Sequence, residues 1–323
     1  MSDGWSRVAL ETIAQLVAAR TGLVTTRTPE DFERASVRAM ERLAIENWGE
    51  FAGKLAAGVG WDALLDEITI GETYFFRNRE HFDLVRDTIV PAILRERPTD
   101  HGLRVWSAGC ASGEETYSLA ILLDQLGLLA NARVLGTDIS NQAIAKARAC
   151  CYREWAFREI DTASSDRYFE GERNERRVVS EIREQVLFSQ VNLADKVYPS
   201  SSNDTENNDL IFCRNVLIYL SREAIERVGR QFFASLAPGG WLVTGPSDPL
   251  LSHAAPFEVI TNPRGICYRR PSQTKSARWS HPPRANDRIE LVRPSGPIAD
   301  QPITLPPVAA TVPRPLSDAA LTV

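Results

Sequence analysis

Acidic side chains occur where a nucleotide-binding fold usually offers only backbone amides. Glu114 and Glu115 follow a turn that contains Gly109 and Gly113, and Asp138 follows a second apolar run. An acid at the end of a strand can bind the ribose hydroxyls of a nucleoside. Acids at the start of a helix would repel a phosphate from the helix N-terminus. The pattern therefore predicts a site for a nucleoside that carries positive charge and no phosphate.

S-adenosylmethionine meets this description, because its sulfonium and ammonium groups are cationic. The glycine spacing G-x-x-x-G also misses the dinucleotide fingerprint and the phosphate loop. Two structural explanations stay open. Ser112 and Glu115 fit a capping box, in which Glu115 bonds back to the helix N-terminus. The stretch Asp138-Ile-Ser140 fits a cap for the helix predicted over Asn141–Ala149.

A sheet must hold these acids at one edge, and the chain contains suitable strands. Short apolar runs alternate with amphipathic helical stretches between Gly102 and Gly245. This alternation predicts an α/β fold with a doubly wound parallel sheet, whose ligands bind beyond the carboxyl ends of the strands. The predicted strands are Leu103–Ser107, Val134–Thr137, Leu210–Cys213 and Trp241–Thr244.

Two further pairs of short apolar runs predict hairpins. Phe257–Ile260 and Ile266–Arg269 flank a turn and would give the sheet an antiparallel edge. Arg176–Ser180 and Gln185–Ser189 predict a second, short hairpin, inserted at about residues 171–190.

The two ends of the chain differ from its middle. Apolar residues spaced by three and four from Val8 to Ile70 predict a small helical domain over residues 1–70. The sheet domain would then span residues 71–270. Roughly half of the 19 prolines lie from Pro271 onward, where apolar periodicity stops. Residues 271–323 are therefore predicted to form a disordered Pro-rich tail.

Composition argues against several classes of partner. The chain of 323 residues has a formal net charge of −5 and scattered basic residues, so it lacks the basic footprint of a nucleic-acid or membrane-surface binder. No apolar run approaches the roughly 20 residues of a bilayer span. The five cysteines and four histidines show no metal-ligand spacing. A cytoplasmic protein without a metal site is expected.

Two stretches show a family resemblance. Ile68-Thr-Ile-Gly-Glu-Thr-Tyr-Phe-Phe-Arg77 and Asp209-Leu-Ile-Phe-Cys-Arg-Asn-Val-Leu-Ile-Tyr-Leu220 resemble motifs of the CheR family of chemoreceptor glutamate O-methyltransferases. With 106–115, 136–138 and 236–240 in the same order, the resemblance covers roughly residues 1–270. It implies a seven-stranded methyltransferase sheet, an all-α N-terminal domain, and S-adenosylmethionine as cofactor with S-adenosylhomocysteine as product. The implied reaction forms glutamate methyl esters in chemosensory adaptation. A methylesterase would oppose this reaction by removing them.

The resemblance also assigns roles at matching positions. Arg77 and Tyr219 would face the transferred methyl group and the incoming glutamate, although Arg77 is also consistent with a cation–π partner and Tyr219 with an aromatic cap on the sheet. The cofactor residues would be Thr73 and Arg77 in the cleft, Gly109 in the turn, Glu115 at the methionine end, Asp138 at the ribose, Asn192 and Leu193 beside the adenine, and Asn215 and Val216 on the methionine side.

A basic stripe is a candidate docking surface. Arg34, Arg38 and Arg42 recur every four residues and would share one helix face. As in the family, this face would bind the acidic methylation helices of a receptor. Pairing of the stripe with Glu30 and Glu41 is an equally open explanation.

The sequence departs from the family pattern in three places. Gly71 stands where the family commonly has an asparagine that contacts the cofactor, and Gly245-Pro-Ser-Asp248 replaces Gly-His-Ser-Glu. The insertion between Phe169 and Asn192 is short, whereas in family members with a long version it binds a tethering peptide at the receptor C-terminus. The resemblance therefore implies that a receptor C-terminal pentapeptide tether is not bound here. We expect a monomer.

Two other functions stay open from the sequence. One is a non-catalytic S-adenosylmethionine-binding scaffold of a chemosensory pathway, which Gly71 and the Pro-rich tail favour mildly. The other is a methyltransferase with another acceptor, although the nitrogen-directed Asn/Asp-Pro-Pro-Tyr motif is absent where Cys213-Arg-Asn-Val216 stands.

Overall fold

The computed structural model describes residues 2–24, 28–160, 166–172 and 174–272. Of the predicted Pro-rich tail, all but Pro271 and Ser272 lies outside the described residues. Among the described residues, no helix is long and apolar enough to cross a bilayer.

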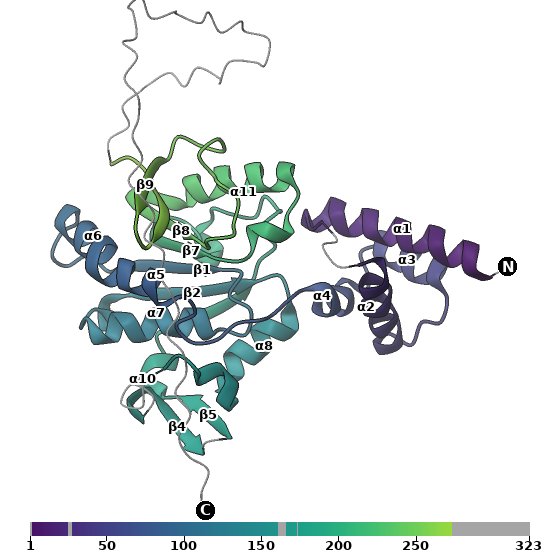
Figure 1. Cartoon of the computed structure of the whole chain (residues 1–323), viewed down its shortest axis with the longest axis horizontal. Coiled ribbons are helices and arrows are strands. Elements are labelled where there is room, and N and C mark those ends of the chain that lie inside the picture. Colours follow the sequence, from purple (N-terminus) through teal and green to yellow (C-terminus); the bar gives the residue numbers. More distant parts are fainter. Residues whose placement is uncertain (1, 25–27, 161–165, 173, 273–323) are drawn as a thin grey trace, which may run out of the picture. The chain divides into compact units, whose positions relative to one another are not determined.

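A seven-stranded sheet forms the centre of the fold, in the order β6-β2-β1-β7-β8-β10-β9 (Figure 1). The first five of these strands run parallel, and β10 pairs antiparallel with both β8 and β9. This confirms the predicted doubly wound sheet with its antiparallel edge. The strands are β1 Arg104–Ala108, β2 Arg133–Asp138, β6 Val186–Gln190, β7 Asn208–Cys213, β8 Leu236–Thr244, β9 Glu258–Asn262 and β10 Gly265–Arg269.

Alternating side chains of the central strands build a core on each face of the sheet. Val105 of β1 and Leu210 of β7 are register partners and lie in one core. The next pair, Trp106 and Ile211, lies in the other. Because successive strand residues point to opposite faces, a continuous apolar run is what a strand covered on both sides requires. Every residue of β7 is buried accordingly.

Helices supply the two covers. The segment α5 to α6 and helix α7 pack on one face, and α11 packs on the other (Figure 1). The helices of this part of the chain are α5 Arg79–Leu84, α6 Val90–Glu96, α7 Glu114–Gln125, α8 Asn141–Ala149, α10 Ser180–Arg183 and α11 Arg222–Ser235, with the π-helical turn η1 Val85–Ile89. Short 3₁₀ turns are η2 Leu129–Asn131, η3 Glu154–Phe157, η4 Ser201–Asn203 and η5 Leu217–Tyr219.

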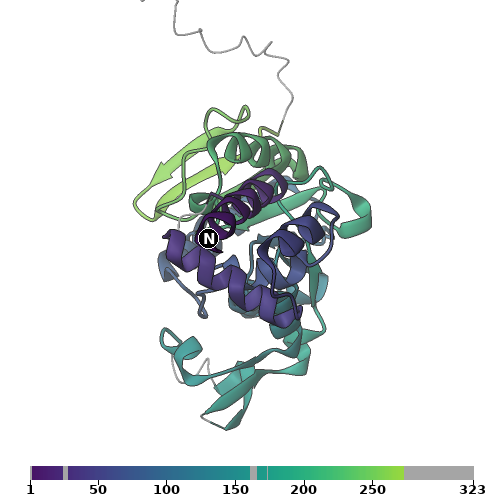
Figure 2. The same cartoon turned by 90° about the vertical axis from the view of Figure 1, so that its right-hand side faces the viewer.

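The N-terminal helices lie together as a group (Figures 1 and 2). Their buried side chains form a separate hydrophobic cluster. Thr28 caps α2 by accepting from Asp31 N, and Asn47 caps α3 by accepting from Glu50 N. Leu23 forms an antiparallel bridge with Leu220, so this part contacts the sheet part directly. The helices are α1 Ser2–Thr21, α2 Pro29–Arg42, α3 Trp48–Ala56 and α4 Trp61–Ile68.

The predicted second hairpin was wrong in its pairing. The run Gln185–Ser189 contributes to β6, which pairs parallel with β2 at the edge of the main sheet. The run Arg176–Ser180 contributes to β5 (Glu175–Val178), which pairs with β4 (Phe169–Glu172) and β3 (Cys151–Tyr152) in a separate three-stranded sheet. The short helix α10 separates the two runs and packs against α7. Local pattern identified the strands but could not identify partners far along the chain.

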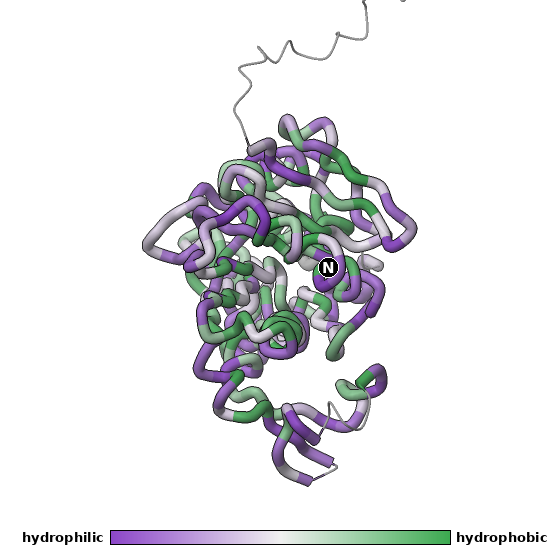
Figure 3. Tube along the Cα trace, turned by 90° about the vertical axis from the view of Figure 1, so that its left-hand side faces the viewer, coloured by the Kyte–Doolittle hydropathy of each residue, from purple (hydrophilic) through white to green (hydrophobic). Residues whose placement is uncertain are grey.

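The inserted sheet is a thin structure. Most residues of β4 and β5 are exposed, and this part of the chain is largely hydrophilic in Figure 3. Phe75 contributes to its apolar contact with the rest of the molecule, because its ring centroid lies 4.9 Å from that of Tyr152 and 4.7 Å from that of Phe169. The aromatic segment before Arg77 therefore anchors the inserted sheet.

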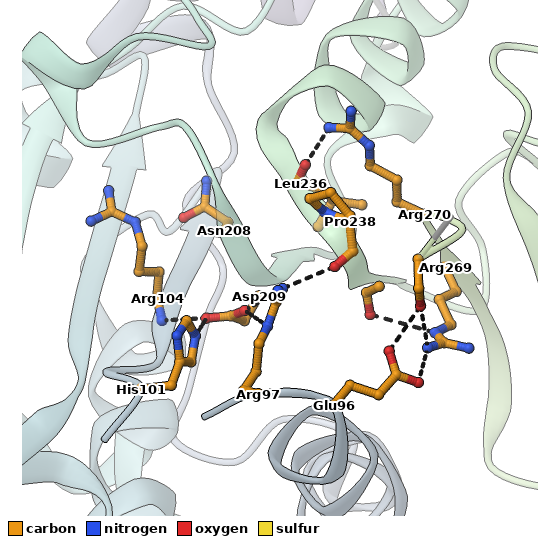
Figure 4. A network of polar contacts seen from close by, with 12 residues as sticks. Glu96, Arg97, His101, Arg104, Asn208, Asp209, Leu236, Pro238, Arg269 and Arg270 are labelled. Atoms are coloured by element: carbon orange, nitrogen blue, oxygen red, sulfur yellow. Dashed lines mark hydrogen bonds and ion pairs between the residues drawn. The ribbon is translucent and has the colours of Figure 1, made fainter. Parts of the chain in front are cut away.

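A buried carboxylate fastens the amino ends of the central strands (Figure 4). Asp209, at the start of β7, accepts from Arg97 Nε at 3.0 Å and from the backbone N of Arg104 at 3.1 Å. The oxygen that accepts from Arg104, Oδ2, also lies 2.8 Å from His101 Nε2. Arg97 also donates to the carbonyl of Pro238 in β8. This network lies at the edge opposite the carboxyl ends, where the candidate site is found.

Candidate active site

A pocket opens at the carboxyl ends of β1, β2 and β7. Side chains from α1 and α2, including Val17, Thr21 and Phe32, contribute to its wall. The pocket brings together every residue that the sequence assigned to catalysis or to cofactor binding: Thr73, Arg77, Gly109, Glu115, Asp138, Asn192, Leu193, Asn215, Val216 and Tyr219.

The turn after β1 needs glycine. Gly109 has φ of 82°, a conformation that residues with a Cβ rarely adopt. A Cβ at this position would also lie 2.4 Å from Cγ2 of Val216. The backbone amides of Gly109 and Cys110 both donate to the carbonyl of Thr137, at 2.7 and 2.8 Å. These bonds fasten the turn after β1 to the end of β2.

Asp138 ties two turns together at the pocket. Its Oδ2 accepts from the amide of Ala111 at 2.9 Å, and its Oδ1 accepts from the amide of Ser140 at 2.9 Å. The predicted cap in Asp138-Ile-Ser140 is present: the N-cap of α8 is Ser140, whose hydroxyl accepts from Ala143 N, and Asp138 supports it by accepting from the Ser140 amide. Burial raises the pKa of Asp138, and the neighbouring carboxylate of Asp66 adds to this rise. The carboxylate still has acceptor capacity for a ligand hydroxyl.

Glu115 does not form the capping box. The N-cap of α7 is Gly113, which has no side chain to take part. Glu115 instead accepts from Ser107 Oγ at 2.8 Å and from Arg214 Nε at 2.8 Å. The adjacent Glu114 accepts from Ser112 Oγ, is not among the described lining residues, and has its pKa raised to about 7 by burial. The two adjacent acids therefore have different environments.

Arg214 is a site residue that the sequence analysis did not single out. Its side chain is 2% exposed, and its Nη1 donates to the carbonyl of Arg77 and lies 3.3 Å from Nδ1 of His81. Its guanidinium lies over the rings of Phe82 and Phe212, 5.1 and 4.9 Å from their centroids. An arginine at the end of a buried strand was the available signal, but its partners lie far along the chain.

His81 is held neutral by these surroundings. Burial, and then the positive charge of Arg214, lower its pKa from 6.5 to about 4. At neutral pH its Nδ1 can therefore accept from Arg214.

Arg77 is fixed mainly by a hydrogen bond. Its Nη1 donates to the carbonyl of Glu72 at 2.7 Å, and its guanidinium lies 5.8 Å from the ring centroid of Tyr74. Arg158 lies much closer to that ring, at 3.3 Å, and 3.4 Å from the ring centroid of Trp155. Arg158 is thus the nearer cation to Tyr74, while Arg77 lines the pocket.

The loop that carries Asn215 and Tyr219 wraps around a carboxylate. Asp248 accepts from the amides of Asn215 at 2.7 Å, Gly245 at 2.8 Å and Ile218 at 3.3 Å. Asn215 has φ of 58°, an uncommon conformation that these bonds help to hold. Asp248, at the end of the divergent Gly245-Pro-Ser-Asp248, therefore shapes the wall of the pocket.

Asn192 has the contacts of a turn residue as well as a place in the pocket. Its Oδ1 accepts from Ala194 N at 3.0 Å, and its Nδ2 donates to the carbonyl of Arg20 at 2.9 Å. Leu193 beside it is buried and lines the pocket.

The basic stripe is already paired, with partners other than those expected. Arg34 pairs with Asp31, Arg38 with Glu67, and Arg42 with both Asp66 and Glu67, whereas the sequence had suggested Glu30 and Glu41. The expected partners were wrong because α4, which carries two of the acids, packs beside α2. None of the three arginines is among the described residues that line the pocket.

The donor set of the pocket fits S-adenosylmethionine. The pocket is lined by three acidic residues, Glu72, Glu115 and Asp138, together with apolar side chains such as Ile139 and Val191. The glycine turn offers a close backbone approach. Among the described residues, no group of three or more His, Cys, Asp or Glu side chains could hold a metal ion.

Comparison with known proteins agrees with this fit. Residues 71–266 match the family described as CheR methyltransferase, SAM binding domain. Chemotaxis protein methyltransferase 1 of Pseudomonas aeruginosa is 31% identical over 242 residues, which are 72% of this chain and 86% of that protein. The chemotaxis protein methyltransferase of Salmonella typhimurium is 33% identical over 247 residues, 73% of this chain and 82% of that protein.

The sheet and its pocket define an S-adenosylmethionine-dependent methyltransferase. The chain belongs to the CheR methyltransferase family, and it is a protein-glutamate methyltransferase of that family.

Proposed function

We propose that this protein transfers the methyl group of S-adenosylmethionine to glutamate side chains on the cytoplasmic methylation helices of chemoreceptors. The glutamate methyl esters formed in this way would be removed by a methylesterase of the same pathway. One observation carries the assignment of the site. The acids and side-chain amides assigned to the cofactor line the same pocket as the two candidate catalytic residues, at the carboxyl ends of the strands.

The cofactor end of the pocket has a donor or acceptor for each part of the ligand. Asp138 would accept from the ribose hydroxyls, and Asn192 and Leu193 would flank the adenine. Glu115 and Arg214 present opposite charges side by side. Such a pair suits the ammonium and carboxylate groups of the methionine end. Thr73, Gly109, Asn215 and Val216 would close the pocket around that end.

The acceptor needs orientation more than activation. The bound cofactor supplies an electrophilic methyl group on its sulfonium. A solvent-exposed glutamate side chain has a pKa of about 4.3 and is already ionised at neutral pH, so no general base is required. Arg77, fixed by the carbonyl of Glu72, would orient this carboxylate, and Tyr219 would shape the space around the methyl group. Alignment of reactants contributes up to roughly 7–11 kcal/mol in favourable cases.

Receptor docking is proposed at the stripe on α2. The side chains of Arg34, Arg38 and Arg42 are 68%, 47% and 41% exposed, so an acidic helix can reach them. Docking there would exchange their present carboxylate partners for those of the receptor. Exposed ion pairs contribute only about 0–1 kcal/mol each, so this exchange is energetically possible.

We propose a cytoplasmic monomer that does not use a receptor pentapeptide as a tether. The inserted sheet has β4 as one of its edges, and β4 and β5 pair over only Phe169–Glu172 and Glu175–Val178. Calorimetric titration of such a pentapeptide checks this point, and measurable binding would contradict it.

The experiment for the function itself combines two assays. S-adenosylhomocysteine is titrated calorimetrically into the wild type and Asp138→Ala, and transfer of labelled methyl groups to a receptor cytoplasmic fragment is followed as base-labile esters. We expect micromolar binding that Asp138→Ala abolishes, and transfer that Arg77→Lys and Tyr219→Phe reduce without equal loss of binding. Binding without transfer to any receptor fragment would favour a scaffold.

A further inference from the structure

Asp66 is a buried carboxylate between the helical part and the cofactor site. It lies on α4, its side chain is 4% exposed, and it is not among the described residues that line the pocket. Its Oδ1 accepts from Ser140 Oγ at 2.6 Å and from the amide of Gln142 at 3.1 Å. Asp66 of α4 is therefore hydrogen-bonded to the N-terminal turn of α8.

Ser140 connects Asp66 to the carboxylate assigned to the ribose. The hydroxyl of Ser140 donates to Asp66, while its backbone amide donates to Oδ1 of Asp138 at 2.9 Å. Ser140 is 3% exposed and also caps α8. One buried residue thus links Asp66 to Asp138 by two hydrogen bonds. The charge of Asp66 also acts directly, since it helps to raise the pKa of Asp138.

The other end of this network reaches the protein surface. Oδ2 of Asp66 lies 3.2 Å from Nη2 of Arg42, whose side chain is 41% exposed. Arg42 also pairs with Glu67, which binds Arg38 at 2.6 Å. The cation that compensates Asp66 therefore belongs to the basic stripe itself.

We propose that Asp66 is a positioning residue that couples cofactor binding at Asp138 to the ion pairing of Arg42. The coupling rests on the proposed function, because it assumes cofactor contact with Asp138 and acceptor docking at Arg42. An acidic acceptor segment that draws Arg42 away leaves the Asp66 carboxylate uncompensated beside Asp138. Cofactor affinity then falls, and by reciprocity bound cofactor weakens acceptor docking at Arg42.

The test removes the cation without a receptor. S-adenosylhomocysteine is titrated calorimetrically into the full chain as wild type, Arg42→Gln, Asp66→Asn and the double variant. We expect Arg42→Gln to weaken binding about fivefold or more. In the Asp66→Asn background, the same Arg42→Gln change should have little further effect. Lys54→Gln is the matched control, since Lys54 pairs with Glu50 on its own helix α3, and it should bind like the wild type.

A pH series separates coupling from structural damage. The groups facing Asp138 are the amides of Ala111, Ile139 and Ser140, the carboxylate of Asp66 and the thiol of Cys110. Without Arg42, stronger repulsion from Asp66 would raise the pKa of Asp138 further. As pH is lowered, the affinity for S-adenosylhomocysteine should therefore begin to fall at a higher pH in Arg42→Gln than in the wild type. Adding Asp66→Asn should move the start of this fall back toward the wild-type pH. Simple damage would weaken binding equally at every pH.

Two results would overturn the coupling. One is wild-type affinity in Arg42→Gln, and the other is full additivity of the two substitutions. Arg42→Lys, which keeps the charge, should restore most of the affinity and so guards against a folding artefact. Failure of the underlying function would look different: Asp138→Ala would then retain normal binding.

Discussion

Arg214 Nε lies 2.8 Å from Oε2 of Glu115, and this buried ion pair forms part of the pocket wall. Arg214 at the same time donates to the carbonyl of Arg77. One guanidinium thus positions both an acid assigned to the cofactor and the backbone of a residue assigned to the acceptor. A planar fork with several donors can do this, whereas a lysine ammonium cannot reach the same partners together.

We therefore expect Arg214→Lys to weaken binding of S-adenosylhomocysteine by about tenfold or more, the loss typical of a charged hydrogen bond. Calorimetric titration measures this effect. Ser107→Ala, which removes the neutral partner of Glu115, should cost less. Equal losses in the two variants would contradict the importance of the charge.

The lowered pKa of His81 predicts a loss of stability in acid. In the unfolded chain His81 binds a proton near its ordinary pKa of 6.5, whereas in the folded chain it does so only near pH 4. Between these values the unfolded state binds more protons, so the free energy of unfolding falls as pH falls. Denaturant unfolding at several pH values checks this. His81→Asn, which keeps an acceptor for Arg214, should show a shallower decline between pH 6.5 and 4.

Gly71 predicts that cofactor affinity can be increased. It lines the pocket, and a Cβ built on it would meet no heavy atom within 4 Å. Gly71→Asn should tighten S-adenosylhomocysteine binding by about fivefold, through about 1 kcal/mol from a new hydrogen bond. Gly71→Ala is the control, because it changes backbone entropy without adding a polar group. Identical affinities of the two variants would show that the amide makes no contact.

Asp209 predicts a large effect on stability with little effect on binding. Asp209→Ala removes the fully buried partner of Arg97 and His101. It should lower the free energy of unfolding by about 3 kcal/mol. Glu96→Gln, in the same region but 43% exposed, should cost less than about 1 kcal/mol. Denaturant unfolding compares the two, and S-adenosylhomocysteine affinity measured on folded Asp209→Ala should match the wild type.

The sequence predicted the local parts of the fold and missed the distant pairings. The buried runs that became β1, β2, β7 and β8 were visible because a strand covered on both faces is continuously apolar. The partner of the run Gln185–Ser189 was not visible, because nothing in its own composition distinguishes a hairpin from an edge strand.

The same limit applied to the site. Glycine turns and terminal acids identified Gly109, Glu115 and Asp138 as pocket residues, since their types have local signatures. Arg214 and Asp66 gave no such signal, because each acts through side chains that are distant in sequence and near only in the folded chain. Charge partners of this kind need the tertiary structure.

The bridge between Leu23 and Leu220 has a kinetic consequence. The amide of Val24 donates to the carbonyl of Tyr219, and the amide of Ser221 donates to the carbonyl of Gly22, both at 2.8 Å. These bonds latch the segment after α1 onto the loop that carries Tyr219, across one wall of the pocket. Opening this side of the pocket means breaking two backbone hydrogen bonds. Cofactor exchange through this side of the pocket would therefore require these two bonds to open first.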